Sequence, residues 1–208
     1  MSKVLFTSLI SVFVLSACGL PRYGASITYN DRNPNPIPVV MPANAPSITQ
    51  QFRPPQETVF DGATSDGHLG LDVWADRRTP VLAAAPGRVT TSYFDPAYGN
   101  TLVIDHGVDE EGLRVTTRYV HLSNRDKRRG DIVARGEQIG GLGGTGVLAG
   151  GFPHLHFEVV RRTQDNKLIP YDPHLFWVDG VGRVTCFDPD REIPALPFRI
   201  TYPVICQA

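Results

Sequence analysis

Short runs of alternating apolar and polar residues, each closed by Gly, Pro, Asp or Asn, recur between about residues 80 and 160. A period of two is typical of strands with one face in a core, and turn residues between such runs favour antiparallel pairing. No amphipathic helix of convincing length is present. We therefore expect a mainly antiparallel β domain, in two packed sheets or a partly open barrel, with loops around a groove. The pattern predicts these strands: PVLAAAP (80–86), GRVTTSY (87–93), NTLVIDHG (100–107), LRVTTRYVHL (113–122) and HLHFEVV (154–160).

The run HLHFEVV places two histidines on one strand face. Residues two apart in a strand point to the same side, and the apolar members of this run need a core. His154 and His156 therefore point together into the space opposite that core, with Glu158. Taken alone, the pair is equally typical of two surface histidines on a half-buried strand. In RVTTRYVH the same alternation places His121 on one face with Val115, Thr117 and Tyr119.

A second polar constellation lies upstream in HLGLD (68–72). If this segment is extended, His68 and Asp72 share a face while the leucines between them turn inward. Two imidazoles and one carboxylate make a suitable zinc triad, with the fourth position left for water. The spacing does not decide whether one or both histidines of HLH would join it. The remaining histidines, His106 and His174, are interpreted as structural.

Composition narrows the classes of function. The chain has 208 residues, 41% hydrophobic residues and a formal net charge of −1. These values fit one globular domain with appendages and give no basic excess for nucleic acid. The run GLGGTG (141–146) matches a dinucleotide fingerprint, but no helix is predicted after it. We therefore interpret it as a loop at the rim of a site.

The first residues have a different pattern. A polar start with Lys3 precedes an apolar run over residues 4–15, which is too short to span a bilayer and is typical of a signal peptide. The run ends in LSAC (15–18), which resembles the lipobox of bacterial lipoproteins. That resemblance implies cleavage after residue 17 and a lipid anchor on Cys18. The alternative is an ordinary secretory signal in which Cys18 is incidental.

Cys186 and Cys206 remain once Cys18 is assigned. In an exported protein such a pair is most simply a disulfide, which we predict here. Closing a loop of about twenty residues is worth roughly 3 kcal/mol in the chain-entropy model. A reactive or metal-binding thiol is the alternative, but both cysteines lie far in sequence from the histidines.

The motifs, in their order along the chain, resemble those of the LytM/lysostaphin-type peptidoglycan metallopeptidases. The resemblance covers about residues 50 to 175 and rests on HLGLD, VLAAAPGRV, YGNTLVIDHG, RYVHL, GEQIGGLGGTG and PHLHFEV. It implies an antiparallel β domain whose groove holds one zinc ion per chain. It further implies zinc ligands at His68, Asp72 and His156. By the same resemblance His121 and His154 are the catalytic pair.

The resemblance implies a zinc endopeptidase that cleaves peptide bonds in the stem or crosslink peptides of peptidoglycan. The expected partners are peptidoglycan and, through the lipid on Cys18, a membrane; no nucleic acid is expected. Because Gly19 replaces the aspartate associated with inner-membrane retention, we expect the periplasmic side of the outer membrane. The alternative is a non-catalytic module that binds the cell wall or activates a murein amidase. Such modules usually lose zinc ligands, and this sequence retains all three.

These interpretations divide the chain into four parts: a signal peptide (1–17), a lipidated Cys18 with a proline-rich linker (18–49), a metallopeptidase domain (50–175) and a C-terminal extension with the disulfide (176–208). A proline-rich linker is extended and would let the head work away from the membrane. Self-inhibition by an asparagine of the linker is a further possibility. We expect the extension to form a hairpin beside the core.

Overall fold

The computed structural model describes residues 37–54 and 67–207. Its elements pair antiparallel in two sheets, ordered β1-β2-β10-β6-β5-β4-β8, with β11 beside β10, and β3-β9-β7. The strands and 3-10 turns are β1 (Ile48–Gln50), β2 (Leu71–Val73), β3 (Pro80–Leu82), β4 (Gly87–Asp95), β5 (Gly99–Val108), β6 (Arg114–Leu122), β7 (Asn124–Arg125), β8 (Ile132–Val133), β9 (Gln138–Gly141), η2 (Val147–Ala149), β10 (Leu155–Arg162), β11 (Leu168–Tyr171) and η3 (Pro173–Leu175).

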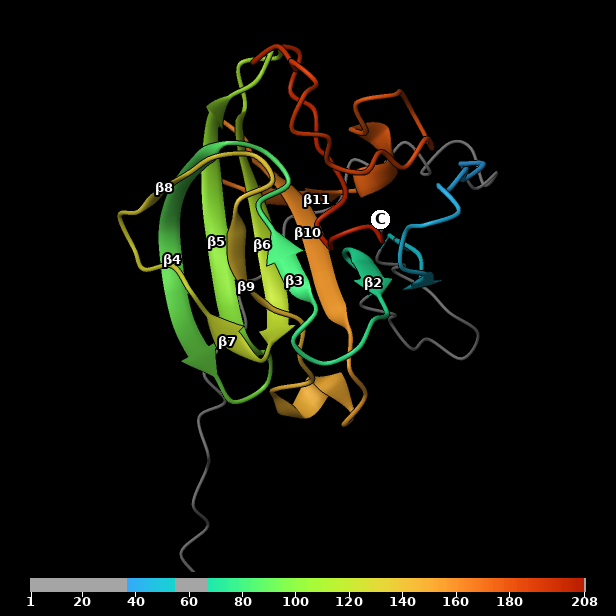
Figure 1. The fold of residues 1–208 in the computed structure, drawn as a ribbon. Coiled ribbons are helices and arrows are strands. Elements are labelled where there is room, and N and C mark those ends of the chain that lie inside the picture. The colour runs from blue at the N-terminus through green and yellow to red at the C-terminus, as the bar shows by residue number, and fades with distance from the viewer. Residues whose placement is uncertain (1–36, 55–66, 208) are drawn as a thin grey trace, which may run out of the picture.

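The small sheet lies against one face of the large one, and the core fills the space between them (Figure 1). Val81 of β3 and Ile139 of β9 meet Leu102, Tyr119 and Phe157 of the large sheet, all fully buried. These residues are the apolar members of the alternating runs, and their side chains form the inner face of each sheet. The predicted mainly antiparallel β fold is confirmed.

All five predicted strands are present, as β3, β4, β5, β6 and β10. Their alternation is long enough to be recognised, whereas β7 (Asn124–Arg125) and β8 (Ile132–Val133) have two residues each. Strands this short carry no readable period and form only because neighbouring strands offer backbone partners.

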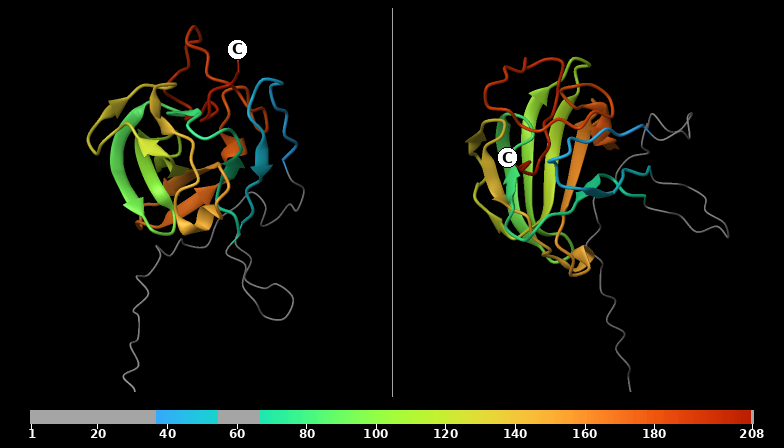
Figure 2. Two further views of the ribbon diagram at one scale, coloured as in Figure 1. Left: turned by 60° about the horizontal axis from the view of Figure 1, so that its bottom comes forward. Right: turned by 45° about the vertical axis from the view of Figure 1, so that its right-hand side comes forward.

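The end of the predicted linker belongs to the folded head. β1 (Ile48–Gln50) pairs with β2, and Val39, Met41 and Ala45 pack against the core. The backbone of Val40 bridges to Arg183 of the C-terminal extension. In Figure 2 the N-terminal segment lies beside the C-terminal one on the side of the molecule that carries β2.

The C-terminal extension is not the predicted hairpin. Within the described residues after η3 it makes single bridges, Trp177 to Ile200 and Val81 to Val204, and no paired strands. Prolines recur along it and cannot donate to a ladder, which explains the irregular path. It nevertheless contributes Trp177, Ile200 and Tyr202 to the core, each with 0% exposure. The extension is therefore part of the same packed unit.

The structure contains the Cys186–Cys206 disulfide, with a Cα–Cα separation of 6.1 Å. The predicted signal peptide, Cys18 and the first part of the linker lie outside the described residues. Within the described part of the chain, no helix has the length and hydropathy needed to cross a membrane.

Candidate metal centre

Two neighbouring strands bring the HLGLD and HLH motifs together. β2 and β10 pair so that Asp72 lies opposite His156, while the residues on either side of each enter the core. His68 lies just before β2. Gly70 allows this close approach, because a Cβ there would lie 2.2 Å from the carbonyl oxygen of Phe157. Because the neighbouring residues of both strands are buried in the core, Asp72 and His156 lie together on the opposite face, next to His68.

The three polar side chains form a compact cluster. The distance from His68 Nε2 to Asp72 Oδ1 is 3.0 Å, and that from His156 Nδ1 to the same oxygen is 2.8 Å. The two ring nitrogens lie 3.1 Å apart. The three donor atoms fall within 4.8 Å of one another, so one metal ion could contact all of them. Two imidazole nitrogens and a carboxylate oxygen are ligands that zinc accepts, which fits the predicted triad.

His121 and His154 lie beside this cluster. Their ring centroids are 4.7 Å apart, and the His121 ring is 6.3 Å from that of His156. His154 Nε2 lies 4.0 Å from Asp72 Oδ1. The structure thus brings all five candidate site residues into one group.

His121 reaches the site by leaving the strand pattern. Its φ of 64° is in the left-handed region, next to a break in the register between β5 and β6. Tyr119 keeps the predicted phase: it is fully buried, and its hydroxyl accepts from the backbone N–H of Ala84 at 2.9 Å. Tyr119 therefore packs in the core, and the irregular backbone turns His121 toward His154.

Hydrogen bonds to the far side of each ring orient the histidines. His68 Nδ1–H donates to the backbone oxygen of Gln51 at 2.8 Å, and His156 Nε2–H donates to Glu158 Oε1 at 3.1 Å. Glu158 in turn accepts from Arg118 Nη1 at 3.0 Å. Each ring thus presents its other nitrogen to Asp72, the arrangement expected of metal-binding histidines.

The surroundings of the group shift the pKa values of His121 and His156 in opposite directions. Burial lowers the pKa of His121 to about 4, outweighing the hydrogen bond from its Nδ1–H to the Thr145 oxygen. Although burial opposes its charge, hydrogen bonds to Asp72 and Glu158 raise the pKa of His156 to about 9. The same contacts, from His156 and His68, hold the pKa of Asp72 below its ordinary value despite burial. Asp72 is therefore ionised and His121 neutral at pH 7.

Two residues that hydrogen-bond to the cluster or to its partner Glu158, Gln51 and Arg118, could not be identified from the sequence. Gln51 carries no motif, and its carbonyl reaches His68 only because residues 48–53 lie beside the HLGLD segment. Arg118 lies opposite Glu158 on β6, a pairing that needs the strand register. Strand alternation does place Glu158 with the histidines, but gives no partner for it.

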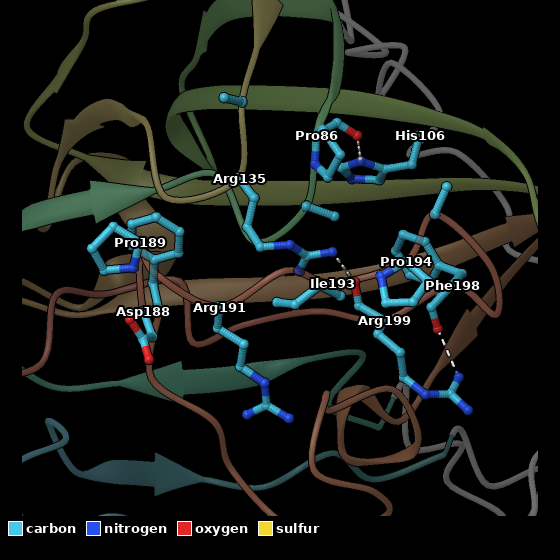
Figure 3. Close-up of a pocket in the computed structure, with 14 residues that line it drawn as sticks. Pro86, His106, Arg135, Asp188, Pro189, Arg191, Ile193, Pro194, Phe198 and Arg199 are labelled. Carbon is cyan, nitrogen blue, oxygen red and sulfur yellow. Dashed lines mark hydrogen bonds between the residues drawn. The ribbon is translucent and has the colours of Figure 1, made fainter.

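A cavity of about 420 Å³ lies between the core and the C-terminal segment 187–199, and none of the five clustered residues lines it (Figure 3). Arg135 donates to the backbone oxygens of Ala84 and Arg199, at 2.6 and 2.9 Å. Arg191 pairs with Asp179 at 2.8 Å. Arg135 and Arg191 thus have partners within the protein. Their contacts hold the C-terminal segment in place, and neither residue belongs to the His–Asp–His cluster.

A mainly antiparallel β fold with a His–Asp–His cluster and two further histidines beside it defines a metallopeptidase type of centre. The family model described as Peptidase family M23 matches residues 66–170, and the chain belongs to this family. The resemblance to LytM/lysostaphin-type peptidases is thereby confirmed.

The chain is similar to proteins named as endopeptidases over part of their length. It is 36% identical over 117 residues to peptidoglycan DD-endopeptidase ShyB of Vibrio cholerae, covering 56% of this chain and 26% of ShyB. It is 41% identical over 91 residues to DD-carboxypeptidase/endopeptidase Mpg of Neisseria meningitidis, covering 44% of this chain and 19% of Mpg. The chain therefore spans about a quarter or less of these relatives.

Solved structures share the fold. A zinc-containing peptidase from Vibrio cholerae superposes with a TM-score of 0.50 and 32% identity, covering 64% of this chain and 37% of that one. The antimicrobial peptidase lysostaphin from Staphylococcus simulans gives a TM-score of 0.52 at 24% identity, covering 73% and 57%. The second likeness concerns the fold alone.

Proposed function

We propose that this protein is a zinc-dependent endopeptidase that hydrolyses peptide bonds in the stem or crosslink peptides of peptidoglycan. The observation that carries the proposal is the convergence of three donor atoms within 4.8 Å, with two more imidazoles alongside. The relatives named as peptidoglycan DD-endopeptidases support the substrate class. We assign the zinc ligands to His68, Asp72 and His156, and the catalytic pair to His121 and His154.

The residues present suit zinc. Asp72 is ionised, and the hydrogen bonds of the two imidazoles to Gln51 and Glu158 leave the inner nitrogen of each ring for a metal, which would displace the second proton that the raised pKa gives His156. Zinc bound here supplies Lewis-acid activation of a water molecule and of the scissile carbonyl.

His121 is suited to accept the proton of the attacking water. Its Nδ1–H is committed to the Thr145 oxygen, and burial keeps the ring neutral, so Nε2 carries a free lone pair. We assign His154 the complementary role, a hydrogen bond to the developing oxyanion from an Nε2–H of the doubly protonated ring, because its Nδ1–H is already committed to the Phe152 backbone oxygen. Its Nδ1–H donates to the Phe152 oxygen at 3.1 Å, which orients Nε2 toward Asp72.

A groove of about 370 Å³ runs over the open face of β4, β5, β6 and β10 and includes Glu158 and Arg118. Arg162, at the far end of β10 from the histidines, also lines it and donates to the Asn166 side chain. Stem peptides carry free carboxylates, for which arginine is a matched partner. We propose that the groove receives the extended peptide and that Arg162 binds one of its carboxylates.

We propose that the protein is a lipoprotein of the periplasmic face of the outer membrane, anchored through Cys18. The lipobox-like LSAC sequence and the disulfide, which suits an exported compartment, support this location. Cys18→Ala should move the protein out of the membrane fraction or leave its precursor uncleaved. Unchanged membrane fractionation of this variant would refute the anchor.

The substrate proposal is tested by digestion of purified murein with the zinc-loaded chain lacking its lipid anchor, followed by mass analysis of the products. New peptide termini, absent with His121→Ala, are expected and would locate the bond. Sugar fragments without peptide cleavage would overturn the proposal. Binding to murein without any cleavage by the wild-type chain would favour a non-catalytic module instead.

A further inference from the structure

Three polar groups outside the family-matched residues lie in a row behind His68. Trp177 Nε1 and His174 Nδ1 are 2.8 Å apart, and His174 Nε2 and Gln51 Oε1 are 2.8 Å apart. The backbone oxygen of Gln51 then meets His68 Nδ1, also at 2.8 Å. The row joins the C-terminal extension to the histidine that begins HLGLD.

The direction of each hydrogen bond is fixed by its partners. An indole N–H only donates, so His174 Nδ1 must accept and its Nε2 carries the proton. That Nε2–H donates to the side-chain oxygen of Gln51. The backbone oxygen of Gln51 only accepts, so His68 Nδ1 carries a proton and His68 Nε2 faces Asp72 with its lone pair. One protonation pattern satisfies the whole row.

The far end of the row is rigid. Trp177 has 0% and His174 2% exposure, and the His174 backbone N–H donates to Asp172 Oδ1 at the start of η3. Burial lowers the pKa of His174 to about 4, so the ring stays neutral, as acceptance at Nδ1 requires. Gln51, by contrast, is exposed and follows a strand of three residues. The hydrogen bond from His174 therefore fixes the position of Gln51, which the short strand β1 alone would hold only loosely.

The segment that contains Gln51 contacts the metal centre at two further points. Gln50 pairs with Asp72 in the β1–β2 register, and the backbones of Arg53 and His68 exchange hydrogen bonds of 2.8 Å in both directions. The backbone of residues 50–53 thus lies against the backbone of the HLGLD segment, and these contacts do not use the side chain of Gln50.

We propose that Gln51 is a positioning residue for the metal ligand His68, and that His174 and Trp177 complete the metal centre by holding Gln51 in place. This inference rests on the zinc site of the proposed function. It gives the C-terminal extension a role in the site: it fixes the orientation of one ligand through the outer hydrogen bond that metal-binding histidines need.

The test is Gln51→Met in the otherwise intact chain, because this side chain is exposed and the change keeps its length. Zinc affinity, measured by competition with a chelator, should weaken, but by less than the about 10- to 100-fold typical of losing an outer hydrogen-bond partner itself, because the backbone oxygen of Gln51 remains. In the zinc-loaded protein the His68 Nδ1–H proton, followed by NMR, should exchange faster with water. Trp177→Phe, which removes the indole donor, should shift both readouts in the same direction by a smaller amount.

Gln50→Met is the matched control, since it makes the same change one residue away, keeps the backbone pairing with Asp72, and alters an exposed side chain that has no hydrogen bond within the described part of the chain. It should leave zinc affinity and proton exchange as in the wild type. Wild-type values for both readouts in Gln51→Met would overturn the inference, as would equal losses in Gln50→Met. Neither readout uses murein, so these outcomes are distinct from failure of the proposed peptidase activity.

Discussion

At the scale of single residues, the site depends on one departure from regular structure. Alternation along β6 predicts His121 on the same face as Tyr119, and that prediction fails because His121 adopts a φ of 64°. A left-handed non-glycine residue costs of order 1–3 kcal/mol and persists where the surroundings impose it. The sequence identifies His121 as a candidate but cannot predict the backbone conformation that turns it toward His154.

His121→Asn should distinguish the effect of the left-handed backbone on stability from the effect of the imidazole on catalysis. Asparagine tolerates the left-handed conformation, so we expect the free energy of unfolding to change by less than about 1 kcal/mol. Murein hydrolysis should fall by about two to four orders of magnitude, because the proposed general base is lost. Denaturant unfolding and hydrolysis rates check both parts. His121→Val, which disfavours positive φ, should be clearly less stable than His121→Asn; equal stabilities would contradict the role of the backbone.

His106 predicts a pH dependence of stability. Its ring lies between the Pro86 oxygen and the Thr117 hydroxyl, and burial lowers its pKa to about 4 from the ordinary 6.5. Because the unfolded chain binds the proton more readily, the contribution of neutral His106 is present above pH 6.5 and is lost as the pH falls toward 4. Between pH 7 and pH 5 the wild type should therefore lose about 2 kcal/mol more than His106→Gln. Unfolding curves of equal pH dependence would refute this.

At the scale of elements, the sequence predicted the strands that are long enough to show alternation of apolar and polar residues. The long strands β4, β5, β6 and β10 were recognisable because each alternates over several residues. The close approach of Asp72 to His156 was not, since it depends on the antiparallel register of β2 and β10, which only the folded sheet defines. The path of the extension was mispredicted because its prolines prevent the hairpin that its apolar residues suggested.

Arg162 tests the groove formed by these strands. If it binds a carboxylate of the peptide away from the reacting bond, Arg162→Ala should raise KM for a soluble murein peptide several-fold and leave kcat near the wild-type value. Lys167→Ala, a change at an exposed cation of the neighbouring turn that pairs with Asp165, is the control and should alter neither. A fall in kcat at unchanged KM would argue against a binding role for Arg162.

At the scale of the whole molecule, the two ends of the described chain stabilise each other and the site. Asn44 Nδ2 donates to the Gln207 oxygen, and Val40 bridges to Arg183. Contacts between segments this far apart leave no local pattern, which is why the sequence suggested a free linker. The Cys186–Cys206 pair could be predicted from residue type and the expected export alone.

Removal of the disulfide should test how far the extension contributes to overall stability. The bridge closes a sequence separation of 20 residues, so Cys186→Ser with Cys206→Ser should lower the free energy of unfolding by roughly 3 kcal/mol. Chemical denaturation of the oxidised wild type and the double variant gives the difference. Identical unfolding midpoints would show that packing of Trp177 and Tyr202 holds the extension without the bridge.

The two histidines of HLH, His154 and His156, are proposed to differ in role although they lie two residues apart. The most direct measurement is zinc content and murein hydrolysis rate on the same preparations of His154→Ala and His156→Ala. His154→Ala should keep one equivalent of zinc and lose activity by about two to four orders of magnitude, because only an acid–base or oxyanion group is removed. His156→Ala should lose both zinc and activity, because two remaining ligands rarely hold zinc tightly. Loss of zinc from His154→Ala with retention in His156→Ala would show that the two roles are reversed.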